Sequence, residues 1–377
     1  FLMEHEHFTY PEAIKYLAKK YNIEVEETQK TSEQKLEDSE RESMYLITEF
    51  AKEHFKNNLT NSEEGKSIGM SYFKEREFSE DIIDKFQLGY SFNKSNQFSE
   101  KALAKGYKLD FLEKTGLTIV KDKENIDRFK GRVIFPILSM SGRVLGFGGR
   151  TLKSSKNIAK YINSPESLIY NKSKVLYGIF QAKQSIVKED NCFLVEGYTD
   201  VIKLYQKGIK NVVASSGTAL TENQIRLISR LTKNITVLFD GDSAGSRAAL
   251  RGIDIILEQG MNVRICNLPE GEDPDSFANS KQTDELILFL KDNSKDFIKY
   301  KASLLVDQAD KDPVKKAAVI RNMVESISKI NDQIQKEIYI KECSSIMGIS
   351  EQVLYSTLAQ IQKKRIQKRH KRFKGKF

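Results

Sequence analysis

The sequence lacks the features that would place it in a membrane, in an oxidising compartment or among P-loop proteins. Its 377 residues contain no apolar run of the roughly 18–20 residues that a membrane-spanning helix needs. The three cysteines, Cys192, Cys266 and Cys343, are far apart and form no CxxC pair, so neither a disulfide framework nor a zinc site is expected. No G-x-x-x-x-G-K-[ST] sequence occurs. These absences favour a cytoplasmic protein with reduced thiols and no membrane partner.

The beginning of the chain also lacks two familiar features. It starts at Phe1 rather than at an initiator Met, and no basic-then-apolar signal sequence follows. We therefore expect the sequence to be a piece of a longer protein.

Positive charge is concentrated at one end of the chain. The formal net charge is +9, and residues 363–377 hold nine Lys or Arg and no acid, which leaves residues 1–362 formally neutral. A neutral body binds nucleic acid only through local patches of charge. The basic tail itself is either a solvated extension or an additional phosphate contact.

Composition and periodicity divide the chain into five parts and predict an α/β fold. We expect a helix and linker at 1–42, a basic mixed α+β subdomain at 43–185, an α/β subdomain at 186–280, a nearly all-helical subdomain at 281–362 and the tail at 363–377. Residues 24–42 are acid-rich and predict a linker or a weakly ordered helix. Residues 132–138 and 143–147, joined by Ser141-Gly142, predict a β-hairpin.

Strands and helices alternate between residues 190 and 275. Apolar strands are predicted at 192–195, 211–214, 235–239 and 262–267, with helices between them at 199–207, 222–231 and 244–259. Such alternation indicates a parallel sheet with helices on its faces.

Acidic residues follow three of these predicted strands. Glu196 follows the first, Asp240 and Asp242 follow the third, and Asp273 and Asp275 follow the last. Ligands of open α/β sheets bind at the carboxyl ends of the strands, so these carboxylates should share one edge. Mg²⁺ prefers carboxylate oxygens, and two such ions can activate an attacking hydroxyl and stabilise a leaving group. A single such pair is often only a helix cap, whereas three at one edge indicate a metal site.

The two acids after the last strand carry a further expectation. Pro274 should hold Asp273 extended, and the alternation of an extended chain would then place Asp273 and Asp275 on one side.

Cations and an aromatic residue gather between glycines upstream of the predicted sheet. Arg150 ends the run Gly146-Phe-Gly-Gly-Arg150, Lys160, Tyr161 and Asn163 follow shortly after, and Lys172 comes next. The cations suit a path for phosphates, and Tyr161 is available for stacking on a base. The alternative is a hairpin with solvated cations.

The order of these motifs resembles a known family. Glu-Gly-Tyr-Thr-Asp at 196–200 and Asp-Gly-Asp-Ser-Ala-Gly at 240–245 resemble the Toprim domain that bacterial primases share with topoisomerases and some nucleases. The runs R-V-I-F-P-I, G-F-G-G-R, K-Y-I-N-S-P-E, L-Y-G, E-G-Y-T-D and G-E-D-P-D follow in the order typical of bacterial replicative (DnaG-type) DNA primases. This resemblance covers about residues 1–350, and only Thr199, where that family commonly has Met, departs from it.

The resemblance implies a function and a set of site residues. The chain would be the catalytic core of a DNA-directed RNA polymerase that makes short RNA primers on single-stranded DNA, releasing pyrophosphate from NTPs. Catalysis is expected from Glu196, Asp240 and Asp242, and metal binding from these three together with Asp273 and Asp275. Template or nucleotide binding is expected from Arg76, Arg150, Lys160, Tyr161, Asn163 and Lys172, with Arg76 supported only by the run Tyr72-Phe-Lys-Glu-Arg76.

The same resemblance implies cofactors and partners. Two or more Mg²⁺ or Mn²⁺ ions are expected, and structural Zn²⁺ only in an N-terminal domain missing from this chain. Partners would be the template, NTPs, the nascent RNA primer and the replicative helicase, the last through a region also missing here. We expect a monomer.

Two other classes of function compete with a primase. A Toprim nuclease would leave the motifs at residues 128–178 unexplained, and a topoisomerase needs a catalytic Tyr that none of the recognised motifs supplies. A non-catalytic DNA-binding or scaffold module would be expected to lose the acids, and all five are present. NTP-dependent primer synthesis separates these possibilities.

Overall fold

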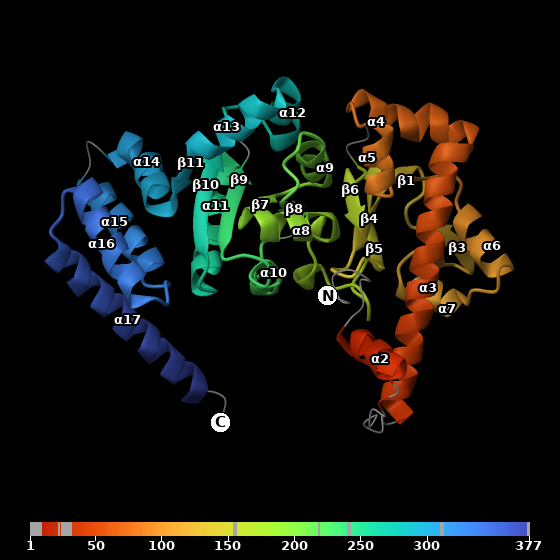
Figure 1. Ribbon diagram of the computed structural model, residues 1–377, viewed down its shortest axis with the longest axis horizontal. Helices are drawn as coiled ribbons and strands as arrows, with labels where there is room; N and C mark the ends of the chain where they lie inside the picture. Colours follow the sequence, from red (N-terminus) through yellow and green to blue (C-terminus); the bar gives the residue numbers. More distant parts are fainter. Residues whose placement is uncertain are drawn as a thin grey trace. The chain divides into compact units, whose positions relative to one another are not determined.

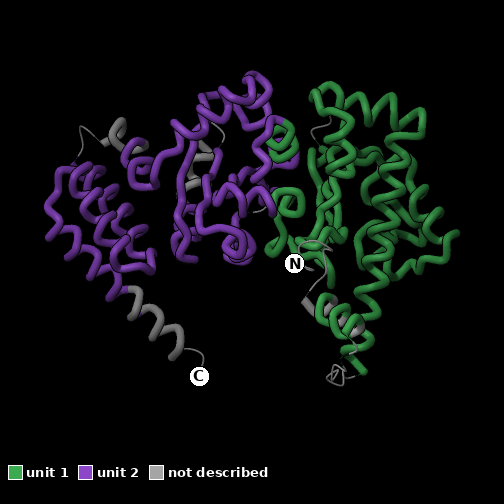
Figure 2. The backbone as a smooth tube through the Cα atoms, in the orientation of Figure 1, with its two compact units in different colours: residues 1–183, 201–206 green, residues 184–200, 207–377 purple. Residues whose placement is uncertain are grey.

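The structure is a computed structural model that describes residues 10–21, 23, 32–153, 157–217, 219–239, 243–309 and 313–374. The chain divides into two compact units, of which unit 1 is residues 1–183 with 201–206, and unit 2 is residues 184–200 with 207–377 (Figure 2). The five-part division of the sequence stays a prediction. Each unit is described by itself.

Unit 1 mixes helices with a four-stranded sheet (Figure 1). Its helices are α2 (Tyr10–Tyr21), α3 (Ser32–Asn61), the π-helix η1 (Gly65–Met70), α4 (Ser71–Glu75), α5 (Glu80–Lys85), α6 (Gln97–Ala104), α7 (Leu109–Lys114) and the 3-10 turn η2 (Lys172–Lys174). Its strands are β1 (Gly89–Ser91), β2 (Thr118–Lys121), β3 (Glu124–Asp127), β4 (Arg132–Leu138), β5 (Val144–Thr151) and β6 (Tyr161–Asn163).

The predicted hairpin forms the centre of the unit 1 sheet. Its strand order is β1-β4-β5-β6, and every neighbouring pair is antiparallel. Strand β5 continues to Thr151. The glycines of G-F-G-G-R therefore lie within a strand and not in turns. A Cβ at Gly149 would lie 2.6 Å from the Phe129 ring, so this strand needs glycine because core side chains press against its backbone.

Helix α3 includes residues 32–42, for which the sequence left open a linker or a weakly ordered helix. These residues belong to one continuous helix that runs to Asn61, and residues 24–31 lie outside the described part. Charged residues at 32–42 remain exposed, while Ile47, Ala51 and Phe55 join the buried core of unit 1. The helix therefore continues on its polar residues because its carboxyl half is anchored by packing.

The end of α9 (Tyr198–Gln206) belongs to unit 1, although the helix begins in unit 2. The Lys203 side chain is only 1% exposed and donates a hydrogen bond to the carbonyl oxygen of Arg76. Gln206 accepts from the amide of Ser79 at 2.9 Å and donates to the carbonyl of Glu77 at 2.8 Å. The segment at Arg76–Ser79 is thus held by residues more than a hundred positions later in the chain.

Unit 2 contains the predicted parallel sheet, with one additional strand. Its strands are β7 (Cys192–Val195), β8 (Val212–Ala214), β9 (Asn234–Phe239), β10 (Asn262–Asn267) and β11 (Ser294–Asp296). The order is β11-β10-β9-β7-β8, in which β8, β7, β9 and β10 run parallel and β11 is antiparallel. The sequence analysis missed β11, because a three-residue Ser-Lys-Asp strand has no apolar alternation.

Helices complete unit 2. They are α8 (Ile179–Glu189, whose first turn lies in unit 1), α10 (Glu222–Ile228), α11 (Ser243–Glu258), α12 (Pro274–Ser280), α13 (Thr283–Asn293), α14 (Phe297–Ala309), α15 (Pro313–Ile327), α16 (Gln333–Met347) and α17 (Glu351–Lys374). Helix α11 packs against β9, β10 and α15, and α14 to α17 pack on one another. Pro313 opens α15, and Gly348, at φ 66°, ends α16.

A buried polar cluster joins α11 to the helical bundle. Asp254 on α11 accepts a hydrogen bond from Lys329 Nζ at 2.6 Å, and Lys301, only 1% exposed, has its Nζ 3.8 Å from Asp254 Oδ1. Burial lowers the pKa of Lys301, and Asp254 opposes that shift. Within the described residues, no helix is long and apolar enough to cross a membrane.

Candidate functional site

The predicted acids come after the carboxyl ends of three neighbouring strands in unit 2. Strands β7, β9 and β10 are adjacent and parallel, so their carboxyl ends share one edge of the sheet. Glu196 directly follows β7, and its side chain is exposed. Strand β9 ends at Phe239, immediately before Asp240 and Asp242, which lie outside the described residues.

Backbone contacts on both sides hold Glu196. The amide of Ser216, after strand β8, donates to the carbonyl of Glu196 at 3.0 Å. Ser216 has a φ of 56°, a left-handed conformation that is uncommon for a residue with a side chain. On the other side, Asp200 Oδ2 accepts from the amide of Gly197 at 2.8 Å. A strained turn and a side-chain cap therefore fix the chain direction at this carboxylate.

Helix α9 begins one residue earlier than expected. It starts at Tyr198, so Thr199, where the sequence predicted the helix to begin, lies inside its first turn. The Asp200 side chain, in the same turn, accepts a hydrogen bond from the Gly197 amide.

Asp273 and Asp275 lie in different surroundings. Asp273 is extended, as expected, but it is the N-cap of α12, and its Oδ1 accepts from the amide of Ser276 at 2.7 Å. Pro274 begins the helix, so Asp275 lies in the first helical turn and is 8% exposed. The expectation that strand alternation aligns the two carboxylates is therefore wrong, because proline at the first helical position starts a helix as readily as it extends a chain.

The sheet edge offers the donors that a divalent ion prefers. Within the described residues, no group of three or more His, Cys, Asp or Glu side chains gathers closely enough to hold a metal. Glu196, which is exposed, follows β7, and Asp273 follows β10. These two strands flank β9 in the sheet, and the acids that follow β9 lie outside the described residues. This all-oxygen donor set fits a hard cation.

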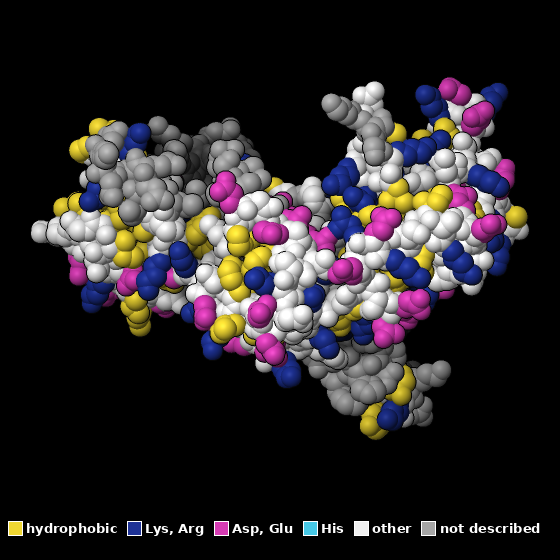
Figure 3. Space-filling view, turned by 90° about the horizontal axis from the view of Figure 1, so that it is seen from above, with side chains coloured by type: hydrophobic (Ala, Val, Ile, Leu, Met, Phe, Trp, Pro, Cys, Tyr) yellow, Lys and Arg dark blue, Asp and Glu magenta, His cyan; other side chains and the backbone are white. Residues whose placement is uncertain are grey.

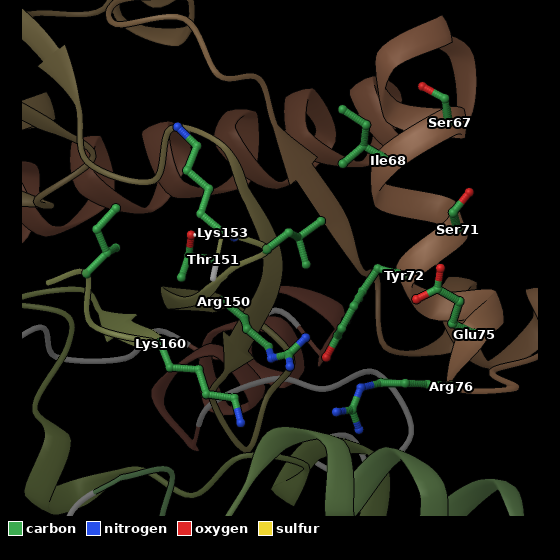
Figure 4. Close-up of a pocket in the computed structure, with 12 residues that line it drawn as sticks. Ser67, Ile68, Ser71, Tyr72, Glu75, Arg76, Arg150, Thr151, Lys153 and Lys160 are labelled. Carbon is green, nitrogen blue, oxygen red and sulfur yellow. Dashed lines mark hydrogen bonds between the residues drawn. The ribbon is translucent and has the colours of Figure 1, made fainter. Parts of the chain in front are cut away.

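Unit 1 contains a cavity of about 860 Å³ that brings three of the predicted cations together. Arg76, Arg150 and Lys160 line it, together with Lys153, and Glu75 is the one acid in its lining. Figure 4 shows the charged ends of Arg76, Arg150 and Lys160 pointing toward the same part of the cavity. Lys and Arg side chains also gather on the face of unit 1 that Figure 3 presents. The cavity therefore suits an anionic ligand.

The cavity lies where β5 and β6 pair. Arg150 on β5 and Tyr161 on β6 are register partners, and the Arg150 guanidinium carbon is 5.9 Å from the centre of the Tyr161 ring. Lys160 immediately precedes β6, and its carbonyl accepts from the amide of Thr151 at 3.0 Å. Pairing of the two strands thus sets these side chains beside one another.

The side chain of Arg132 forms hydrogen bonds that connect β5 with the segment before β6. Its side chain is 7% exposed, and burial lowers its pKa. Its Nη1 donates to the carbonyls of Gly149 and Ala159 at 3.1 Å and of Lys160 at 3.3 Å, and its Nη2 donates to Ala159 at 3.1 Å. One buried guanidinium therefore ties β5 to the segment that carries Lys160.

Asn163 and Lys172 are not in the lining of the cavity. Asn163 pairs with Gly148 at the far end of β6. Lys172 begins η2, and its amide donates to Glu166 Oε1 at 3.0 Å. Their assignment as ligand-binding residues stays a prediction.

Three supporting residues escaped the sequence analysis. Arg132 and Asp200 were inside quoted motifs, yet nothing in a sequence distinguishes a buried, carbonyl-binding Arg from a solvated one. Tyr72 was noted only as a neighbour of Arg76; in the structure it is 7% exposed and lines the cavity. Its i, i+4 spacing from Arg76 was the signal that could have found it.

Comparison with known proteins assigns the chain to a family. Three family models match it: "DNA primase catalytic core, N-terminal domain" at residues 54–183, "Toprim-like" at 193–278, and "DnaB-helicase binding domain of primase" at 299–352. A crystal structure of a DNA primase domain from Pseudomonas aeruginosa is 32% identical, with a TM-score of 0.75, and the alignment covers 84% of this chain and 99% of that one. The chain belongs to the DnaG-type DNA primase family.

Other DNA primases show similar likeness. The enzyme of Clostridium acetobutylicum is 36% identical over 362 residues, 95% of this chain and 59% of that protein. That of Staphylococcus aureus is 33% identical over 359 residues, 94% of this chain and 58% of the relative. This chain thus spans less than two thirds of the length of the curated DNA primases that it matches. An Aquifex aeolicus primase structure with zinc-binding and RNA polymerase domains is 30% identical, with a TM-score of 0.74, over 94% of this chain and 82% of that one.

Membership of the DNA primase family bears on two expectations. The Toprim and primase-core matches imply use of a divalent metal. The helicase-binding region was expected to be missing, whereas a segment described as helicase-binding in primases matches residues 299–352, which include α15, α16 and most of α14. This match corrects that expectation.

Proposed function

We propose that this chain synthesises short RNA primers on single-stranded DNA by joining NTPs and releasing pyrophosphate. The observation that carries the proposal is that β7, β9 and β10 end at one edge of the sheet. In the sequence, these strands are followed by Glu196, by the Asp240-Gly-Asp242 run and by Asp273, respectively. Acids at three adjacent strand ends suit phosphoryl chemistry. Family membership supports the same conclusion.

The acids would hold Mg²⁺, two ions in the simplest arrangement. Glu196, Asp240 and Asp242 are the catalytic ligands in this proposal, and Asp273 and Asp275 contribute to the same metal site. Bound Mg²⁺ would supply charge stabilisation to the attacking and leaving oxygens. The hydrogen bonds at Glu196 and Gly197 fix the main chain from which the Glu196 side chain extends, so the residue needs no backbone rearrangement to bind a cation.

The cations of unit 1 would bind the phosphates of template and nucleotide. Arg76, Arg150 and Lys160 converge on one cavity, and Tyr161 beside Arg150 offers a ring for a base. We include Asn163 and Lys172 in this surface on the resemblance alone. A related catalytic domain, that of a DnaG primase with 28% identity, has a solved structure bound to single-stranded DNA.

The remaining partners belong to the same proposal. The segment at residues 299–352 would contact the replicative helicase, as its matching family model describes for primases. We further propose that the chain works as a monomer in the cytoplasm, with template, NTPs and nascent primer as its other partners.

The test is primer synthesis on circular single-stranded DNA with labelled NTPs and Mg²⁺, with products resolved by length. Wild type should produce short RNA that depends on all required NTPs and disappears with EDTA. Glu196→Gln and Asp240→Asn should each lower the rate at least a hundredfold at saturating Mg²⁺, because a lost ligand removes several kcal/mol of charge stabilisation, about 3 kcal/mol for that factor.

Glu337→Gln is the matched control, because Glu337 is exposed on α16 in the helical part of unit 2 and pairs with Lys341 at 3.2 Å. It should retain the wild-type rate. Cleavage of the DNA without RNA synthesis would replace the proposal by a Toprim nuclease. DNA binding with neither product would indicate a scaffold module.

A further inference from the structure

A single tyrosine ring lies against two of the cations in the unit 1 cavity. The guanidinium carbon of Arg150 is 4.5 Å from the centre of the Tyr72 ring, and that of Arg76 is 5.3 Å from it. Figure 4 shows Tyr72 reaching into the cavity between these two side chains. Two guanidinium groups from distant parts of the chain therefore share one aromatic surface.

Local structure explains why Tyr72 reaches this position. Residue 72 follows the π-helix η1 in α4, and Arg76 is four residues later at the end of that helix, so both side chains fall on one helix face. Arg150 comes from β5, on the opposite wall of the cavity. Contact with Phe73, whose ring centre is 5.3 Å away, holds the Tyr72 ring at the helix.

The ring offsets an unfavourable arrangement of charge. Arg76 and Arg150 share the cavity with two lysines, and Glu75 is the one acidic residue in its described lining. The Nε of Arg150 is buried and, among the described residues, has no hydrogen-bond acceptor. An aromatic face attracts a guanidinium, most strongly where water is excluded. Tyr72 is 7% exposed, and burial raises the pKa of its hydroxyl, so the ring remains neutral.

We propose that Tyr72 is a positioning residue for phosphate binding: its ring holds Arg76 and Arg150 as a pair directed at one anionic group. This inference rests on the proposed function only in taking that group to be a phosphate of the template or of an NTP. It also gives Arg76, which the sequence supported least, a physical connection to Arg150. The ring rather than the hydroxyl carries the role.

The test compares Tyr72→Leu with Tyr72→Phe. Binding of a fluorescein-labelled twelve-residue oligo(dT), and separately of ATP, is measured from 50 to 300 mM salt. Without the ring the guanidiniums lose their common surface, and we expect Tyr72→Leu to bind roughly five- to thirtyfold more weakly. Its salt slope should fall by about 0.7 for each phosphate of a single strand that the protein no longer neutralises. Tyr72→Phe, which keeps the ring, should bind within threefold of wild type.

The two ligands separate the sources of phosphate. A loss confined to oligo(dT) assigns the pair to the template, and a loss confined to ATP assigns it to the nucleotide. Phe86→Leu is the matched control: Phe86 is 1% exposed in unit 1, stacks on Tyr177 at 5.9 Å, and has no cation over its ring among the described residues. It removes a buried ring without touching the pair, so its salt slope should equal that of wild type.

A double-mutant cycle separates positioning from a general loss of structure. On an Arg76→Gln, Arg150→Gln background, Tyr72→Leu should weaken binding by less than twofold, because the groups that it positions are gone. An equal effect of Tyr72→Leu on both backgrounds, unchanged binding by Tyr72→Leu, or equal losses in Tyr72→Leu and Tyr72→Phe would each overturn the proposal. Normal cycle results in a chain that makes no primers would reject the proposed function and leave the role of Tyr72 standing.

Discussion

Replacement of Arg132 by Lys should destabilise unit 1 and disorder the edge that carries Lys160. The guanidinium donates to three carbonyls from two segments, at Gly149, Ala159 and Lys160. A lysine ammonium can reach one such carbonyl at a time, so at least two charge-assisted bonds are broken, each worth about 1.5–3 kcal/mol. Partial relaxation reduces the sum, and we expect the free energy of unfolding to fall by about 2–4 kcal/mol.

Urea unfolding followed by circular dichroism measures this loss, and binding of oligo(dT) to the folded variant measures its consequence. Lys160 should become an ineffective contact in Arg132→Lys, so adding Lys160→Ala should change affinity by less than twofold. Arg128→Lys is the control, because Arg128 is partly buried and has a pKa lowered by burial, but among the described residues it has no hydrogen bond to these carbonyls. A loss below about 0.5 kcal/mol for Arg132→Lys, the usual range for surface substitutions, would refute the reasoning.

Three further predictions concern charge. Lys160→Ala and Lys172→Ala should each lower the salt slope of oligo(dT) binding by about 0.7, and an unchanged slope in a fluorescence titration would show a solvated lysine. Burial lowers the pKa of His54 to about 4, so its neutral form is favoured in the folded state: its contribution is complete above about pH 6.5 and is lost as pH falls toward 4. The dependence of urea unfolding on pH between these values should be less steep in His54→Gln, by about 2–3 kcal/mol in total, and parallel curves would exclude His54 as the cause. Asp254→Ala should lower the free energy of unfolding by about 3 kcal/mol in the same assay, because it removes the carboxylate that lies 3.8 Å from the buried Lys301 ammonium, and a neutral outcome would mean that water replaces the carboxylate.

Secondary structure was predicted best in segments where one pattern of apolar residues dominates. The strands at Cys192–Val195 and Asn262–Asn267 were predicted to the residue, because buried parallel strands are short apolar runs bounded by polar residues. The predicted parallel sheet is confirmed for β8, β7, β9 and β10. The continuation of α3 through an acid-rich segment could not be predicted, because the stability of such a long helix depends on a core at its far end.

The residue types of the candidate site could be predicted from the sequence, whereas the contacts that hold those residues in place could not. Residue types and strand ends were enough to propose Glu196 and the cations at Arg150 and Lys160. The carbonyl bonds of Arg132 and the ring contact between Tyr72 and Arg150 join residues far apart in the sequence. No local pattern encodes such pairs. The conformation of Asp275 was predicted wrongly, as extended rather than helical, because proline permits both an extended chain and a helix start.

The assignment of the end of α9 to unit 1 sets an order for folding during synthesis. Lys203 and Gln206 hold the segment at Arg76–Ser79, so unit 1 remains incomplete until the first strand and helix of unit 2 have left the ribosome. A chain cut at Lys183 would keep every strand of the unit 1 sheet and still expose the backbone that Lys203 covers. Completion of unit 1, and with it of the cation-lined cavity, therefore waits for residues that the chain supplies only after unit 2 has begun.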